Sequence, residues 1–170
     1  MTSREERSKK LRDIGLVPTI QRLAVLEALE GSRDHPTADE IHGTVRKQFP
    51  SISRATVYNT LDALTRAGMI LRLTVDPAAV RYDAFVGPHA HFRCRVCGTV
   101  YDIDLRNGRP IDPEADGHKV ESIRTYAFGV CAQCLKDEKN EAEGRHPTAT
   151  QRRASRKRSS ANPKDPRHGG

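Results

Sequence analysis

The cysteines most constrain what this chain can fold into, because all four of them occur in two Cys-x-x-Cys pairs. Two intervening residues let both thiolates of a pair face one ion about 2.3 Å away, and two such pairs complete the tetrahedral shell of structural zinc. The pairs are Cys94 with Cys97 and Cys131 with Cys134, separated by 33 residues. The spacing therefore predicts one zinc site and leaves no thiol for catalysis.

Two other uses of paired cysteines, redox chemistry and disulfide bonds, fit the sequence less well. A thioredoxin-like Cys-x-x-Cys motif follows a strand in a βαβ pattern, which is missing here. Disulfides are typical of exported proteins, and the first seven residues contain no apolar segment that would direct export. No apolar run approaches the ~20 residues that a membrane span requires. We therefore expect a cytoplasmic protein without a membrane partner.

The positive charge of the chain is unevenly distributed. The net charge is +7, but residues 141–170 hold 8 Lys and Arg against 3 Asp and Glu. The remaining 140 residues hold 21 against 19, so their net charge is close to zero. The net charge of residues 1–140 therefore does not predict nucleic-acid binding. Such a prediction requires a structural motif known to bind nucleic acid. The composition of residues 140–170 predicts a disordered basic tail.

Three helices are predicted before residue 69. Thr19 begins the first helix and Gly31 ends it. A capping box of Thr37 and Glu40 begins the second, in which apolar residues recur at every fourth position up to residue 49. The third begins near Ser53, and its apolar face is formed by Val57, Leu61, Leu64 and Gly68.

After residue 68 the pattern changes from a helical period to an alternating one. Residues 69–75 and 80–83 flank an Asp-Pro-Ala-Ala turn, and this arrangement predicts a β-hairpin. A hairpin that follows a helix-turn-helix is a wing. Residues 1–86 are therefore predicted to form a winged-helix DNA-binding domain.

A second domain is predicted at residues 87–139, beginning at a Gly-Pro break. In residues 100–105, apolar side chains at 101, 103 and 105 alternate with a polar face that carries Asp102, which predicts a half-buried strand. Residues 120–128 are a further strand candidate, and residues 111–117 begin like a helix but have few apolar positions. The predicted fold class is α+β: an N-terminal winged helix-turn-helix domain, a small α/β domain with the four-cysteine zinc site, and the tail.

The third predicted helix carries side chains suited to reading DNA. Arg54 and Thr56 lie in its first turns, and Tyr58 and Asn59 project from the face opposite the apolar one. This part of a helix-turn-helix enters the major groove, where Asn can pair with adenine, Arg with guanine or phosphate, and an aromatic ring with a thymine methyl. For an isolated helix a solvated face would be the simpler interpretation, but the wing favours DNA. Winged helices also bind proteins, so the DNA prediction depends on the combination.

A second group of metal-ligand residues flanks the predicted domain boundary. His89 and His91 form a His-x-His pair, whose side chains point the same way from an extended segment. Asp83 ends the wing strand, and Asp102 lies on the polar face of the later strand. His35 precedes the second helix, where a loop or helix-entry role is the simpler alternative. Imidazole and carboxylate groups so close to a zinc pair favour a second metal site.

Five stretches of the chain resemble the ferric uptake regulator family in order and spacing, at residues 18–22, 35–41, 55–61, 81–83 and 89–98. Proteins of this family are homodimeric, metal-dependent repressors with a winged-helix domain and an α/β dimerisation domain stabilised by four-cysteine zinc. The resemblance covers about residues 8–139. It implies a regulatory metal held by His35, Asp83, His89, His91 and Asp102, and Arg22 joins the predicted DNA-binding residues.

Three positions resemble the peroxide-sensing branch of this family. Asn59 stands where iron-sensing members usually have Arg, and Asp102 where those members usually have Glu. Asp83 occupies a position at which zinc-sensing members tend to have a cysteine. Pro88 and Ala90 replace further His and Asp residues of the iron sensors, which argues against a second regulatory site.

These features predict a transcriptional repressor that binds double-stranded operator DNA as a homodimer, with structural Zn(II) and regulatory Fe(II) or Mn(II). The resemblance implies that peroxide releases the DNA through metal-catalysed oxidation of His35 or His89. The alternatives are an iron-responsive repressor without peroxide sensing and a zinc-ribbon scaffold that binds only proteins. A metallohydrolase is disfavoured because five protein ligands leave little room for substrate. We expect no enzymatic activity and no small organic substrate.

Overall fold

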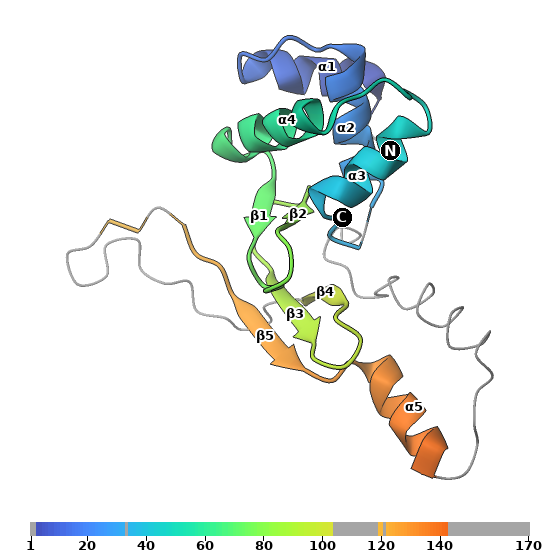
Figure 1. Cartoon of the computed structure of the whole chain (residues 1–170). Helices are drawn as coiled ribbons and strands as arrows, with labels where there is room; N and C mark the ends of the chain where they lie inside the picture. The colour runs from blue at the N-terminus through green and yellow to red at the C-terminus, as the bar shows by residue number, and fades with distance from the viewer. Residues whose placement is uncertain (1–2, 33, 104–118, 121, 143–170) are drawn as a thin grey trace. The chain divides into compact units, whose positions relative to one another are not determined.

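A computed structural model describes residues 3–32, 34–103, 119–120 and 122–142, and it divides between Val86 and Gly87 into two compact units (Figure 1). The first unit contains helices α1 (Arg4–Asp13), α2 (Ile20–Glu30), α3 (Ala38–Arg46) and α4 (Arg54–Arg66), followed by strands β1 (Leu71–Leu73) and β2 (Arg81–Asp83). The second contains strands β3 (Ala90–Cys94), β4 (Val100–Ile103) and β5 (Tyr126–Gly129) and helix α5 (Ala132–Ala142). This combination of helices and small sheets confirms the α+β fold class.

Polar residues begin the three predicted helices of the first unit, as expected. Before α2 the Thr19 hydroxyl accepts the backbone N–H of the third helical residue at 3.2 Å, and Ser53 does the same before α4 at 3.0 Å. Thr37 and Glu40 form the predicted capping box at the start of α3. Each cap satisfies N–H groups that have no partner within the helix. The predicted starting points of α2, α3 and α4 are confirmed.

The end of α3 differs from the prediction. Its regular part stops at Arg46, three residues before the expected end at residue 49. Lys47 and Gln48 donate their backbone N–H groups to carbonyls three residues earlier, at 3.3 and 3.1 Å. Bonds of this shorter period tighten the last turn of a helix. The chain therefore turns toward α4 before the proline that was expected to stop the helix.

Helix α1 lies outside the three helices predicted from the sequence. Leu11 is its one fully buried apolar side chain, which gives too weak a pattern to predict a helix. Arg7 and Lys10 contact Glu30 at the end of α2, at 2.8 and 2.9 Å. Burial raises the pKa of the Glu30 carboxyl, but the hydrogen bonds from Arg7 and Lys10 outweigh burial and lower that pKa overall. Helix α1 is thus attached by one leucine and one ionic cluster.

Replacing Glu30 with glutamine is expected to lower the free energy of unfolding by about 1–2 kcal/mol at neutral pH, because two cations lose a charged acceptor. Since the pKa of Glu30 is lowered in the folded protein, its stabilising contribution is present above the ordinary carboxyl pKa and is lost as the pH falls through the lowered value. Urea unfolding of the variant and the parent should differ at neutral pH and converge in acid. Glu5→Gln, at an exposed position of α1, is the control. A difference that persists in acid would contradict this assignment.

The core of the first unit confirms three of the four residues of the predicted apolar face of α4; the fourth, Gly68, is exposed and lies beyond the helix, which ends at Arg66. Val57, Leu61 and Leu64 are fully buried, whereas Tyr58 on the opposite face is 46% exposed. Gly68, with a φ of 68°, follows the helix in the left-handed conformation that glycine adopts without strain. The four helices and β2 pack around one cluster of buried side chains: Leu11, Leu23, Ala24, Val25, Leu26, Leu29, Ala38, Ile41, Val45, Ile52, Val57, Leu61, Leu64, Ile70 and Tyr82.

The hairpin after α4 is antiparallel, as predicted, but its ladder is shorter. Leu71 pairs with Asp83 and Leu73 with Arg81, so each strand contributes three residues. Between the strands, the carboxylate of Asp76 accepts the backbone N–H of Ala78 at 3.1 Å. This turn, typical of an aspartate next to a proline, takes the remaining predicted residues out of the ladder. The helix-turn-helix is thereby followed by a short wing.

Strand β3 is central in the sheet of the second unit, antiparallel to β4 and parallel to β5 (Figure 1). The candidate strand at 120–128 forms only from Tyr126. Residues 111–117 lie outside the described residues.

Helix α5 continues to Ala142 because its sequence is rich in helix-forming residues. Residues 140–142 are therefore helical, although the composition predicts a disordered tail from residue 140. No helix in the described part of the chain combines the length and the apolar composition needed to cross a membrane.

The buried face of β4 is opposite to the one predicted. Val100 and Asp102 are only 2% and 3% exposed, whereas Tyr101 is half-buried and Ile103 is exposed. The strand was expected to bury the tyrosine and the isoleucine and to expose the carboxylate. Asp102 can be buried because its carboxylate lies beside two imidazoles, and a buried charge requires such partners.

Candidate metal centres

The four cysteine thiols converge in the second unit, although the two pairs are far apart in the sequence. Cys94 Sγ lies 3.9 Å from Cys134 Sγ, and Cys97 Sγ lies 3.9 Å from Cys131 Sγ. All four sulfur atoms lie within 4.8 Å of one another. Thiolates bound tetrahedrally at about 2.3 Å from an ion are about 3.8 Å apart. The donor atoms and their spacing therefore fit one zinc ion.

Local backbone geometry positions these thiols. Cys94 ends β3, and its carbonyl accepts the N–H of Gly98 at 3.0 Å. The φ of Gly98 is 73°, a left-handed conformation that closes the tight turn containing Cys97. From the other pair, the N–H of Cys131 lies 3.3 Å from Cys94 Sγ, and the N–H of Cys134 lies 3.5 Å from Cys131 Sγ. Backbone donors around the sulfurs stabilise thiolate ligands.

The thiols of the cluster differ in how readily they lose a proton. Burial raises the pKa of Cys94, but backbone N–H groups of Cys97, Cys131 and Val96 outweigh burial and lower that pKa to about 6. Burial and the neighbouring thiols raise the pKa of Cys134 instead. A dication among the sulfurs favours the thiolate at every position. Among the described residues, Cys94, Cys131 and Cys134 also form a buried cluster of the second unit, and partly buried side chains pack around it: Phe92, Cys97, Tyr101 and Val130.

A second set of donor groups lies beside β3 and β4. His89 Nε2 is 2.9 Å from His91 Nε2, and Asp102 Oδ1 is 3.6 Å and 3.7 Å from these two nitrogens. The sheet register produces this arrangement, because His91 pairs directly with Asp102. The Nδ1–H of His89 donates to the Gly87 carbonyl at 2.8 Å, which leaves Nε2 as the nitrogen available to bind a metal. All three side chains are buried.

The first unit contains a separate pair of candidate ligands, His35 and Asp83, which are 2% and 3% exposed. His35 lies in the loop before α3, and Asp83 ends β2. His35 Nε2 is 3.9 Å from Asp83 Oδ2, which is too long for a hydrogen bond but suits two ligands of one ion. The other oxygen of Asp83 accepts the N–H of Phe85 at 2.9 Å, which orients the carboxylate. Imidazole with carboxylate is a donor set that suits first-row divalent metals.

Three of the predicted DNA-reading side chains are exposed on α4. Tyr58 and Asn59 lie on the face opposite the core. Arg54 is also exposed, and its guanidinium forms an ion pair with Asp39 of α3 at 3.2 Å. An exposed pair of this kind contributes little stability, so the guanidinium can exchange its partner readily.

The other two predicted DNA-reading residues make local contacts. The Thr56 hydroxyl lies 2.9 Å from the Ser53 hydroxyl at the cap of α4. The guanidinium of Arg22 donates to the Val17 carbonyl at 2.9 Å, at the turn before α2. The Thr56 contact lies at the start of α4 and the Arg22 contact at the start of α2. The sequence pattern did not indicate that these two side chains make contacts at helix starts.

His42 is a buried polar residue for which the sequence gives no clear signal. Its Nε2–H donates to the Ile52 carbonyl at 3.1 Å, so α3 is tied to the residue just before the cap of α4. A histidine on the apolar side of an amphipathic helix looks like any core residue until the fold reveals its partner.

A helix-turn-helix followed by a short hairpin, joined to a unit with a four-thiol cluster, defines a winged-helix protein with a thiolate metal centre. The family model for the ferric uptake regulator family matches residues 13–126. The chain belongs to the ferric uptake regulator family, and the resemblance seen in the sequence is confirmed.

Relatives with known roles agree with this assignment. The peroxide operon regulator of Bacillus subtilis is 36% identical over 137 residues, which are 79% of this chain and 94% of the relative. The crystal structure of the Campylobacter jejuni peroxide stress regulator is 26% identical, with a TM-score of 0.56, and the match covers 79% of this chain and 100% of that one. The ferric uptake regulator of Helicobacter pylori has a TM-score of 0.60 at 23% identity, over 79% of this chain and 95% of that one, and supports the fold. The predicted likeness to peroxide-responsive members is also confirmed.

Proposed function

We propose that the protein is a metal-dependent transcriptional repressor that binds operator DNA as a homodimer and is released by peroxide. One observation carries the proposal: each unit buries at least one imidazole beside a carboxylate, at distances that suit metal ligands. They are His35 with Asp83 in the first unit, and His89, His91 and Asp102 in the second. Membership of a family of regulators supports the same conclusion.

The proposed regulatory site joins these two sets on a single ion. Three imidazoles and two carboxylates would then bind Fe(II) or Mn(II), which accept mixed nitrogen and oxygen ligands. Because the ligands belong to both units, binding would restrict how the winged helix is oriented relative to the second unit. A dimer restricted in this way can match two half-sites separated by whole turns of DNA, so metal binding and DNA binding become coupled.

We assign a separate, structural zinc ion to the four cysteines. A closed shell of four thiolates leaves no open position for substrate, which is typical of structural rather than catalytic zinc. Three of the cysteines are buried and Cys97 is partly buried beside them, so zinc there would stabilise the fold of the unit that is proposed to form the dimer.

In the proposed complex, the start of α4 lies in the major groove. Tyr58 and Asn59 read base edges, Arg54 leaves Asp39 for guanine or phosphate, and Thr56 and Arg22 support the ends of the helices that contact the backbone of the DNA. The wing and the exposed face of α4 are the observations that support this placement.

Tyr58→Ala and Asn59→Ala are each expected to relax sequence preference by about 1–3 kcal/mol, because each removes a contact to a base edge. The measurement is binding to a selected duplex and to a set of its single-base variants, at fixed salt. Asp62→Asn, an exposed change further along α4, is the control and should alter binding to all sequences alike. If Asn59→Ala weakened every sequence equally, its base-reading role would be wrong.

Peroxide sensing follows from the ligands that surround the regulatory ion. A bound Fe(II) would pass one electron to peroxide next to the imidazoles and would regain it from the ring that is oxidised. His35 or His89 would thereby gain one oxygen atom while the rest of the peroxide leaves as water. The oxidised histidine would cease to bind metal, so the two units would no longer be held in the DNA-binding arrangement. The four cysteines would react later, because thiolates engaged by zinc are poor nucleophiles.

The test of the proposed function is anaerobic DNA binding with and without added metal. Duplexes selected from a random pool with Mn(II)-loaded protein should lose affinity when the regulatory metal is removed and the zinc is retained. DNA binding that ignores the regulatory metal would overturn the proposal and favour a scaffold that binds proteins. Metal-dependent binding that peroxide does not reverse would favour the iron-responsive alternative.

A further inference from the structure

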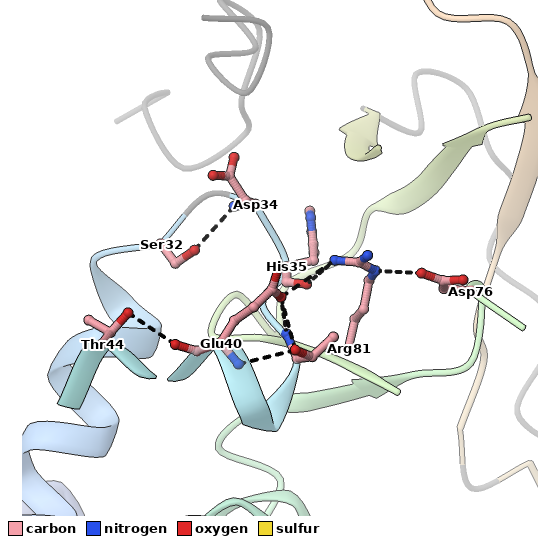
Figure 2. Close-up of polar contacts among 8 residues, drawn as sticks. Ser32, Asp34, His35, Glu40, Thr44, Asp76 and Arg81 are labelled. Carbon is pink, nitrogen blue, oxygen red and sulfur yellow. Dashed lines mark hydrogen bonds and ion pairs between the residues drawn. The ribbon is translucent and has the colours of Figure 1, made fainter. Parts of the chain in front are cut away.

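Arg81 lies at the centre of a group of contacts beside His35 (Figure 2). Its Nε–H donates to Asp76 Oδ2 at 3.0 Å, and its Nη1–H donates to the backbone carbonyl of His35 at 3.2 Å. The arginine and aspartate side chains are only 20% and 6% exposed. Nη1 also lies 3.9 Å from the carboxylate of Glu40 at the start of α3. One guanidinium therefore joins the turn of the wing, the loop of His35 and α3.

The backbone beside Arg81 aligns the same loop with the wing. Tyr82 donates its N–H to the Pro36 carbonyl at 3.0 Å, and Thr37 forms an antiparallel bridge with Arg81. The segment before α3 is thus paired with β2, the strand that ends in Asp83. Both candidate ligands of the first unit are consequently placed by one strand.

His35 occupies a backbone conformation that requires support from its surroundings. Its φ is 47°, and among the described residues other than glycine it alone has a positive φ. Side chains with a Cβ enter this left-handed region with strain and remain there only where other contacts hold them. The hydrogen bond from Arg81 is made to the carbonyl of this strained residue, as Figure 2 shows.

We infer that Arg81, oriented by Asp76, is a positioning residue for the regulatory metal. It holds His35 in the left-handed conformation that directs the imidazole toward Asp83 before the ion binds. This inference rests on the proposed function, because it takes His35 and Asp83 as ligands of one ion. Arg81 is not itself a ligand and acts through the main chain. Holding a ligand in place raises metal affinity by increasing the fraction of molecules ready to bind.

The test measures Mn(II) affinity of the zinc-replete, full-length protein. Arg81→Gln and Asp76→Asn are each expected to weaken Mn(II) binding roughly 5- to 30-fold, as the competent fraction falls. Association should slow while dissociation from the formed site stays unchanged, since only the population that can bind is reduced. At saturating Co(II), a spectroscopic substitute for the regulatory ion, the ligand-field bands should keep their positions because the ligands are the same.

Three further variants make the result specific. The double variant Asp76→Asn with Arg81→Gln leaves no buried unpaired charge, and it should weaken binding no more than either single change if the two residues act as a unit. Arg81→Lys can reach one partner but not both, so its affinity should fall between those of the parent and Arg81→Gln. Arg66→Gln, which breaks an exposed ion pair with Asp62, should leave Mn(II) affinity unchanged.

Two outcomes would overturn the inference, and they can be told apart. If Arg81→Gln binds Mn(II) as tightly as Arg66→Gln does, while His35→Ala loses the metal and changes the Co(II) spectrum, the regulatory site stands and Arg81 does not position it. If His35→Ala retains both the affinity and the spectrum of the parent, His35 is not a ligand, and the proposed site fails together with the role of Arg81.

Discussion

Replacing Cys94 with serine is expected to abolish zinc binding and, with it, the folded second unit and the dimer. The buried apolar side chains described in that unit are Ala90, Val100 and three of the cysteines themselves, so its described part has little other apolar core. Structural zinc in small peptides contributes about 10–16 kcal/mol of binding free energy that is also folding free energy. A loss of this size is comparable to the whole stability of a typical domain, about 5–15 kcal/mol.

The measurements are zinc content by elemental analysis and oligomeric state by light scattering. Thr99→Val is a matched control, because Thr99 lies 3.2 Å from Cys97 Sγ but supplies no sulfur, and valine keeps its shape. The control should retain zinc and the dimer. A stable dimer of Cys94→Ser that contains no zinc would contradict the structural role of the metal.

Iron-loaded protein is expected to release DNA after peroxide treatment, whereas manganese-loaded protein should remain bound. The difference follows from the metals, since Mn(II) does not readily undergo the one-electron chemistry that oxidises its ligands. Asp102→Glu should blunt the iron response and keep metal-dependent DNA binding. The longer side chain still offers a carboxylate, but it moves the oxygen that now lies 3.6 Å and 3.7 Å from His89 and His91. An undiminished peroxide response in this variant would contradict a role for Asp102 beside the oxidised ligands.

The parts of the fold that depend on local chemistry could be predicted from the sequence. The caps at Thr19, Thr37 and Ser53 were identifiable because a hydroxyl satisfies N–H groups only three residues away. The cysteine pairs were identifiable because thiolates at that spacing have few other uses. The apolar face of α4 followed from its period alone.

Features that depend on distant partners could not be predicted in this way. The alternating pattern assigned the carboxylate of Asp102 to the outer face of β4, although the family resemblance grouped it with His89 and His91. Alternation alone does not show that a carboxylate has partners that allow its burial. The attachment of α1 depends on Glu30 of another helix, and a single buried leucine gave no periodic signal. The contact of Arg81 with a backbone carbonyl 46 residues earlier has no sequence signature at all.

The most direct measurement is a peroxide pulse on the anaerobic Fe(II)-loaded repressor bound to a selected duplex, followed by a mobility shift and peptide mass spectrometry. We expect near-stoichiometric peroxide to release the DNA and to add one oxygen, about 16 Da, to His35 or His89, with Cys94, Cys97, Cys131 and Cys134 unmodified. The Mn(II)-loaded protein should show neither change. Release of DNA with both histidines unmodified would contradict ligand oxidation as the signal, and no release at all would contradict peroxide sensing.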